Sequence, residues 1–133
     1  PVLGGLLALG ISMILVFVVI HSPGPVMAVE SWDDFDQHVL QSPRPVLVDF
    51  FGDFCAPCRR LAPTIEKLAK EFKGEVDVVK IDVTKCPELA GRYGVRAIPN
   101  VKLFVRGEVR FEWIGNRPAS DYRTVLQAVL NGG

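Results

Sequence analysis

The stretch VLVDFFGDFCAPC, residues 46–58, decides the fold of this chain. Its first half, Val46–Phe51, is almost continuously apolar, which is typical of a β-strand buried on both faces of a sheet. Two cysteines three residues apart, Cys55 and Cys58, follow at the expected start of a helix. A structural disulfide normally closes a longer loop, because the stabilisation that it provides grows with loop length. The spacing therefore indicates a pair that opens and closes in dithiol–disulfide exchange.

Composition limits the class of protein. The 133 residues include 15 Lys and Arg and 15 Asp and Glu, and 49% of them are hydrophobic. Without a basic excess there is no sign of nucleic-acid binding, and the length suits one domain with an appendage. Three cysteines are too few for a disulfide framework. Cys86 is therefore left over once Cys55 and Cys58 pair, either as a small buried hydrophobe or as a thiol activated at a helix start.

The appendage is an uncharged apolar stretch over residues 2–20, long enough as a helix to span a hydrocarbon core of about 30 Å. We expect residues 1–22 to be a membrane anchor or uncleaved signal segment with a transmembrane-type helix. A short linker at 23–25 then begins a globular domain over 23–133. The alternatives are a secretory signal cleaved near Ala28 and a buried core helix.

The charges after this stretch indicate on which side of the membrane the globular domain lies. Acidic residues come first, and the first basic residue is Arg44. Positive charge is retained on the cytoplasmic side, so the pattern favours a globular domain on the exported, periplasmic or extracytoplasmic side. A domain on the cytoplasmic face and a secreted domain are the alternatives.

Beyond the linker, strand and helix patterns alternate. The expected strands are Val26–Val29, Val46–Phe51, Val76–Val83, Val101–Val105 and Val109–Ile114, the last two joined by residues 106–108. The expected helices run from a Ser31 cap to about Gln41, then over Ala56–Phe72, Pro87–Tyr93 and Pro118–Leu130. This order predicts an α/β fold with a central mixed five-stranded sheet flanked by four helices.

From about Val29 to Leu130 the chain resembles the thioredoxin family. The resemblance is carried by an aspartate within the buried strand, the Cys-Ala-Pro-Cys motif and a downstream Ile-Pro: Asp49, residues 55–58 and residues 93–99, with residues 80–82, Gly107 and Gly115. It implies the thioredoxin fold and a thiol–disulfide oxidoreductase that acts on protein substrates.

Site residues follow from helix position and from the resemblance. A helix N-terminus stabilises a thiolate, so Cys55 is expected to attack and Cys58, one turn further on, to resolve the mixed disulfide. The resemblance implies that Asp49 passes a proton to or from the resolving thiol, with Lys80 as its partner. It also implies a cis peptide bond before a proline and an apolar docking surface, made by Ala97, Ile98, Pro99 and Gly115.

Other chemistries have less support. A zinc site needs about four ligands, and Cys86, His21 and His38 lack pairing spacing, so no metal or other cofactor is expected. With no nucleotide-binding glycine loop evident, electrons are expected from another protein. We expect a monomer that reduces protein disulfides and contacts a membrane through residues 2–20. The alternatives are an envelope disulfide oxidase or isomerase and a non-catalytic binding module in a membrane complex.

Overall fold

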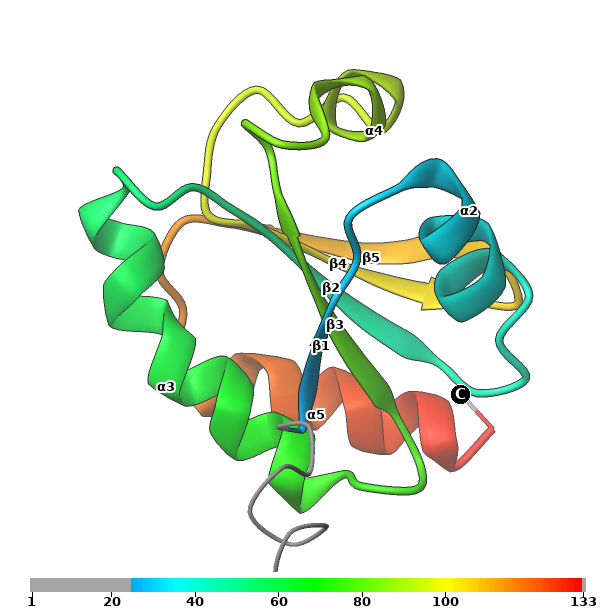
Figure 1. The fold of residues 1–133 in the computed structure, drawn as a ribbon. Helices are drawn as coiled ribbons and strands as arrows, with labels where there is room; N and C mark the ends of the chain where they lie inside the picture. Colours follow the sequence, from blue (N-terminus) through cyan, green and yellow to red (C-terminus); the bar gives the residue numbers. More distant parts are fainter. Residues whose placement is uncertain (1–24, 133) are drawn as a thin grey trace, which may run out of the picture.

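A five-stranded sheet forms the centre of the protein, in a computed structural model that describes residues 25–132. Its strands lie in the order β1-β3-β2-β4-β5 (Figure 1). The first three in this order run parallel, while β4 is antiparallel to β2 and β5 to β4. The strands are β1 (Val26–Ala28), β2 (Val46–Phe51), β3 (Asp77–Asp82), β4 (Asn100–Val105) and β5 (Glu108–Ile114). The predicted mixed five-stranded sheet is confirmed.

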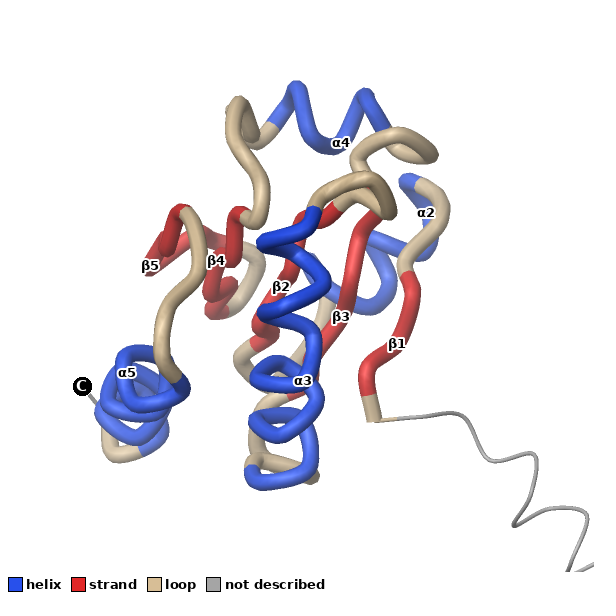
Figure 2. The backbone as a smooth tube through the Cα atoms, turned by 90° about the vertical axis from the view of Figure 1, so that its left-hand side faces the viewer, coloured by secondary structure: helices blue, strands red, loops and turns tan. Residues whose placement is uncertain are grey.

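Helices cover both faces of the sheet. On one face lie α3 (Ala56–Glu71) and α5 (Ala119–Leu130); on the other lie α2 (Trp32–Phe35), η1 (Asp36–Leu40) and α4 (Pro87–Arg92) (Figure 2). Each face has its own apolar core, because side chains alternate between the faces along a strand. In β2, Leu47 belongs to the α3–α5 core, whereas Val46, Val48 and Phe50 belong to the α2–α4 core. The four predicted α-helices are thus present, on the two faces expected.

The first helix differs from the prediction of a single helix from Ser31 to about Gln41. Ser31 does cap it, since its Oγ accepts a hydrogen bond from the Asp34 backbone N–H at 3.0 Å. After four α-helical residues, however, the chain continues as the π-helix η1. The Gln41 backbone N–H donates to the Asp36 carbonyl at 2.9 Å, an i to i+5 bond that closes this wider turn.

The hairpin between β4 and β5 also differs, because Glu108 is the first residue of β5 and not part of the turn. Only Arg106 and Gly107 remain between the strands, with φ of 50° and 79°. Two successive left-handed residues make the turn that suits the twist of an antiparallel pair. The three-residue connection predicted for 106–108 is therefore wrong by one residue.

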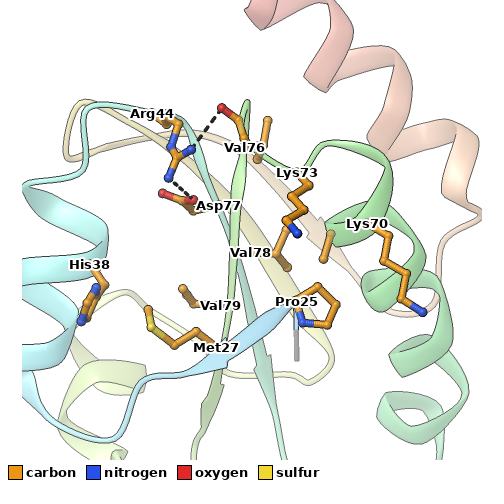
Figure 3. Close-up of a pocket in the computed structure, with 12 residues that line it drawn as sticks. Pro25, Met27, His38, Arg44, Lys70, Lys73, Val76, Asp77, Val78 and Val79 are labelled. Atoms are coloured by element: carbon orange, nitrogen blue, oxygen red, sulfur yellow. Dashed lines mark hydrogen bonds and ion pairs between the residues drawn. The ribbon is translucent and has the colours of Figure 1, made fainter. Parts of the chain in front are cut away.

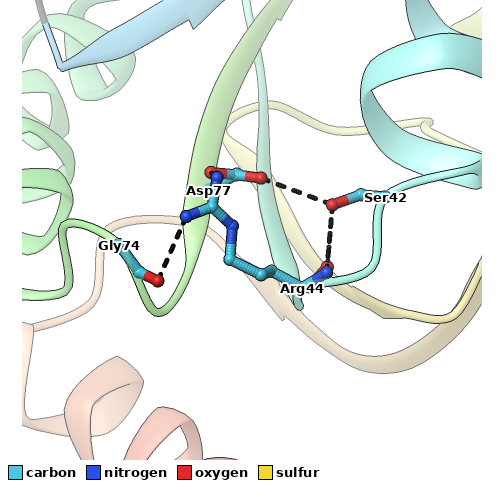
Figure 4. Close-up of polar contacts among 4 residues, drawn as sticks. All are labelled: Ser42, Arg44, Gly74 and Asp77. Carbon is cyan, nitrogen blue, oxygen red and sulfur yellow. Dashed lines mark hydrogen bonds and ion pairs between the residues drawn. The ribbon is translucent and has the colours of Figure 1, made fainter.

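Polar contacts fix the loop that leads into β2 (Figure 4). Arg44 forms an ion pair with Asp77 at 2.9 Å and donates to the Gly74 carbonyl at 3.1 Å. The Ser42 hydroxyl donates to the Arg44 carbonyl and accepts from the Arg44 backbone N–H. These contacts join the starts of β2 and β3, so the strand before the cysteine motif begins at a fixed point.

The predicted membrane helix over residues 2–20 lies outside the described residues. Within residues 25–132, no helix has both the length and the apolar character needed to cross a bilayer.

Candidate active site

Cys55 and Cys58 lie at the start of α3 and are joined by a disulfide. Cys55 is the N-cap residue of this helix, and the backbone N–H of Cys58 donates to its sulfur at 3.2 Å. Both cysteines are buried. A sulfur at this position receives an unpaired helix N–H and the positive end of the helix dipole, and both stabilise negative charge on Cys55 when the disulfide is open.

Asp49 lies on β2 on the same face as α3 and is buried. In the sheet it is opposite Lys80 of β3 and Val101 of β4. Its Oδ1 atom has no hydrogen-bond partner among residues 25–132. Burial raises the pKa of Asp49 to about 7, and the charge of Lys80 offsets part of this rise. Asp49 can therefore both bind and release a proton near neutral pH.

Lys80 acts on Asp49 only through its charge. It is exposed, and its ammonium lies 5.9 Å from the centre of the Phe51 ring. Within the described part of the chain it forms no ion pair with Asp49. The structure thus places the two residues side by side in the sheet, with the lysine side chain at the surface.

The segment before β4 comes close to the disulfide. The carbonyl oxygen of Ile98 lies 3.8 Å from the sulfur of Cys55, and the Ile98–Pro99 peptide bond is cis. Gly115, just after β5, donates its backbone N–H to the Pro99 carbonyl at 2.9 Å. Ile98 therefore lies beside Cys55, and Gly115 is joined to the next residue, Pro99. Ala97 is an exposed residue at the start of this segment.

Phe54 is a candidate that the sequence analysis gave no role. It precedes Cys55, and 72% of it is exposed. A Cβ atom added to Gly52 would lie 2.8 Å from the Phe54 ring and 3.1 Å from the Ile98 side chain, so these two apolar groups converge over Gly52. A large aromatic residue directly before a reactive cysteine is the signal that could have identified it.

Other features of the molecule lie away from these residues. Cys86 is a free, buried thiol against the α2–α4 core, and burial together with the charge of Asp82 raises its pKa. A cavity of about 610 Å³ opens where β1 begins and α3 ends, between Pro25, Met27 and Lys73 (Figure 3). Its lining has no cysteine. Among residues 25–132, no group of three or more His, Cys, Asp or Glu side chains could hold a metal ion.

Known proteins resemble this chain over the same region. The family model described as Thioredoxin matches residues 26–128. Thioredoxin C-2 of Corynebacterium nephridii is 43% identical over 88 residues, which is 66% of this chain and 82% of that protein. Thioredoxin of Rickettsia bellii is 40% identical over 94 residues, covering 62% of this chain and 90% of that protein. The chloroplastic Thioredoxin M5 of rice, Oryza sativa, is 40% identical over 98 residues, 74% of this chain and 57% of that protein.

The matched region contains the whole sheet, the disulfide and the cis peptide bond. A single Cys-x-x-Cys motif occurs in several kinds of protein, but this motif at the start of a helix beside a buried aspartate and a cis-proline is far more specific. Sequence, fold and site agree, and the chain belongs to the thioredoxin family, whose members are protein-disulfide oxidoreductases.

Proposed function

We propose that this oxidoreductase is a reductant of disulfides in protein substrates, with Cys55 as the attacking group. The observation that carries the proposal is the position of Cys55 as N-cap of α3, where the Cys58 N–H points at its sulfur. In the reduced protein, the Cys55 thiolate attacks one sulfur of the substrate disulfide. A Cys55–substrate bond forms, the substrate S–S bond breaks, and the released substrate thiolate takes up a proton.

Resolution of the mixed disulfide needs a second thiolate. Cys58 transfers its proton to the carboxylate of Asp49, and its sulfur then attacks the sulfur of Cys55. The Cys55–Cys58 disulfide forms, and the second substrate sulfur leaves as a thiolate. Asp49 suits this role because burial brings its pKa to about 7, so that it is a stronger base than an exposed carboxylate. Lys80 assists by its charge, which favours the ionised form of Asp49.

Docking of the substrate is assigned to the surface around the disulfide. The Ile98 carbonyl lies 3.8 Å from the Cys55 sulfur, and Gly115 donates to the Pro99 carbonyl, which supports a docking edge made by these residues with the exposed Ala97. The exposed ring of Phe54 adds a large apolar contact. An extended segment of a substrate protein can pair with the backbone here while its side chains contact apolar surface.

The oxidised pair must be reduced again before the next cycle. We assign this step to an upstream protein donor that attacks the Cys55–Cys58 disulfide in the same way and leaves it as two thiols. We also propose that residues 2–20 anchor the chain in a membrane, with the domain as a monomer on the exported side. This assignment rests on the apolar stretch and on the charges that follow it.

The test is reduction of a model disulfide protein by the dithiol form of the full chain. Cys55→Ser should reduce the rate at least about 100-fold, and Cys58→Ser should accumulate the mixed disulfide with substrate. Full activity of Cys55→Ser would contradict the mechanism. The reduction potential tests the direction: a value near about −270 mV fits a reductant, and one between about −120 and −180 mV fits an oxidase or isomerase instead.

A further inference from the structure

Tyr122 of α5 is a buried residue with an unsatisfied hydroxyl. Its side chain is fully buried, and its hydroxyl has no hydrogen-bond partner among residues 25–132. Asp49 Oδ1 is in the same situation. Buried polar atoms are nearly always hydrogen-bonded to protein or to ordered water, because an unpaired one destabilises the folded state. A third such oxygen among residues 25–132, Asn100 Oδ1, belongs to a residue opposite Phe50 on the α2–α4 face. The two oxygens on the α3–α5 face call for a common explanation.

The strand register brings both groups to the same place. Asp49 is opposite Val101, and Val101 is opposite Trp113, so these three residues form one row across β2, β4 and β5. Directly opposed residues of antiparallel strands point to the same face, and Val101 belongs to the α3–α5 core. Tyr122 belongs to that core too, with its ring centre 4.9 Å from that of Trp113. The tyrosine thus packs against Trp113, at one end of the row whose other end is Asp49.

We infer that Tyr122 is a positioning residue for the proton on Asp49: its hydroxyl donates, through one buried water, to the ionised carboxylate. A water molecule between the two oxygens gives each of them the hydrogen-bond partner that it lacks among residues 25–132. When Asp49 takes up a proton, the bridge can reverse, because a hydroxyl both donates and accepts. The inference rests on the proposed role of Asp49 as proton acceptor from Cys58.

The electrostatics agree with this arrangement. Burial raises the pKa of Tyr122 to about 12, and the charge of Asp49 contributes to the rise, so the two groups interact and the hydroxyl keeps its proton. The other charges that act on the pair are Lys80 of β3, Arg117 just before α5 and Asp121 within it. From α3, which packs on this face of the sheet, the titratable buried residue is Cys58, and β4 contributes the apolar Val101 and Leu103.

The decisive experiment is Tyr122→Phe in the full chain, with the titration of Asp49 followed by infrared spectroscopy of its carboxyl group. Loss of a donor to the ionised form should raise the pKa of Asp49 by about one pH unit above the wild-type value. The midpoint of the pH dependence of the exchange rate should rise by the same amount. Asp49→Asn identifies the carboxyl band. It should remove the part of the pH dependence that comes from Asp49 in both backgrounds, and leave the part that comes from ionisation of Cys55.

The matched control is Tyr93→Phe, which removes the chain's other tyrosine hydroxyl from the opposite, α2–α4 side of the sheet. It should leave the pKa of Asp49 unchanged. It also leaves Tyr122 as the sole tyrosine, whose hydrogen-bond state can be followed by ultraviolet resonance Raman spectroscopy. That signal should change as Asp49 titrates, and this readout does not depend on whether Tyr122→Phe folds.

An Asp49 pKa in Tyr122→Phe that stays within about 0.2 pH units of wild type, or falls, would overturn the inference. A Tyr122 Raman signal that ignores the titration would do the same. Neither measurement needs turnover, so the result is separate from that of the proposed function. A wild-type chain that failed to reduce disulfides would contradict the reductant function alone.

Discussion

Asp49 on β2 and Lys102 on β4 are both buried ionisable residues of the same sheet, but only Lys102 forms an ion pair within the described residues. Lys102, which is 3% exposed, forms an ion pair with Glu112 on the next strand, and the Asn100 side chain donates to the same carboxylate. Asp49 has no ion-pair partner among residues 25–132, and burial raises its pKa to about 7. A paired buried charge keeps one protonation state and holds the structure together, whereas an unpaired one can exchange its proton.

The largest effect on the free energy of unfolding is expected for Asp49→Asn, which removes the unpaired buried carboxyl group. Because the folded-state pKa of Asp49 lies above its unfolded value, the native state holds this proton more tightly. The contribution of Asp49 to stability is therefore fully present below pH 3.8 and is lost as pH rises through about 7. At about 1.4 kcal/mol for each pH unit, ionised Asp49 costs the folded state about 4 kcal/mol. Urea unfolding at pH 8.5 should show Asp49→Asn more stable than wild type by about 3–4 kcal/mol, with a difference under about 1 kcal/mol at pH 4.

The control for that prediction is Asp82→Asn. Hydrogen bonds from Thr84 lower the pKa of Asp82, so its ionised form stabilises the fold. Its substitution should destabilise the protein at pH 8.5, with the opposite sign. If Asp49→Asn were also destabilising at that pH, Asp49 would be a structural group like Lys102, and the contrast between the two would fail.

The Lys102–Glu112 ion pair can be broken by removing either partner. Glu112→Ala leaves the Lys102 ammonium buried without its counterion and should cost about 2–3 kcal/mol in urea unfolding at pH 7. Lys102→Met removes the buried charge itself and leaves a carboxylate that is 42% exposed to water, so its cost should stay under about 1 kcal/mol. The reverse ranking would mean that Lys102 stabilises the sheet by packing rather than through the ion pair.

A smaller effect is expected at Lys80, whose charge lowers the pKa of Asp49. Since Lys80 is exposed, water and salt screen its charge. Lys80→Met should raise the pKa of Asp49, measured by the same carboxyl band, by less than about one pH unit, and 0.5 M salt should reduce the difference. Lys85→Met is the control, because this lysine does not contribute to the pKa of Asp49. A difference that persists unchanged at high salt would indicate a direct ion pair between Lys80 and Asp49 in solution.

The sequence predicted the reactive part of the molecule better than its polar interior. The run from Val46 to Phe51 defined β2 to the residue, and the cysteines lie at the helix start where helix signals placed them. Those features are local, because hydrophobic pattern and capping act over a few residues. The ion pair of Lys102 is not determined locally. Its partner Glu112 is ten residues away on β5, and the two side chains come together only because of the two-residue turn at Arg106 and Gly107.

Tyr122 shows the same limit. The sequence predicted the helix that carries it, and the ring is buried. Its position relative to Asp49 depends on how α5 lies across the row through Val101 and Trp113, and no pattern within α5 encodes that contact. The π-helical turn at Asp36–Leu40 was missed for a related reason, because side-chain spacing alone does not separate it from an α-helix.

Cys86 tests whether burial alone makes a reactive group. Like Asp49 it is buried, but it lies on the α2–α4 side of the sheet, its thiol contacts the Val29 carbonyl at 3.9 Å, and burial and nearby carboxylates raise its pKa. A thiol that keeps its proton is a poor nucleophile.

In the native dithiol protein at pH 7, iodoacetamide should therefore label Cys86 at least about 100-fold more slowly than Cys55, as read by mass spectrometry of the tryptic peptides. Cys86→Ala should leave disulfide exchange unchanged and cost at most about 1 kcal/mol, since it removes one small apolar group from the core. Rapid labelling of Cys86, or slower exchange in Cys86→Ala, would show that this second buried group takes part in the chemistry.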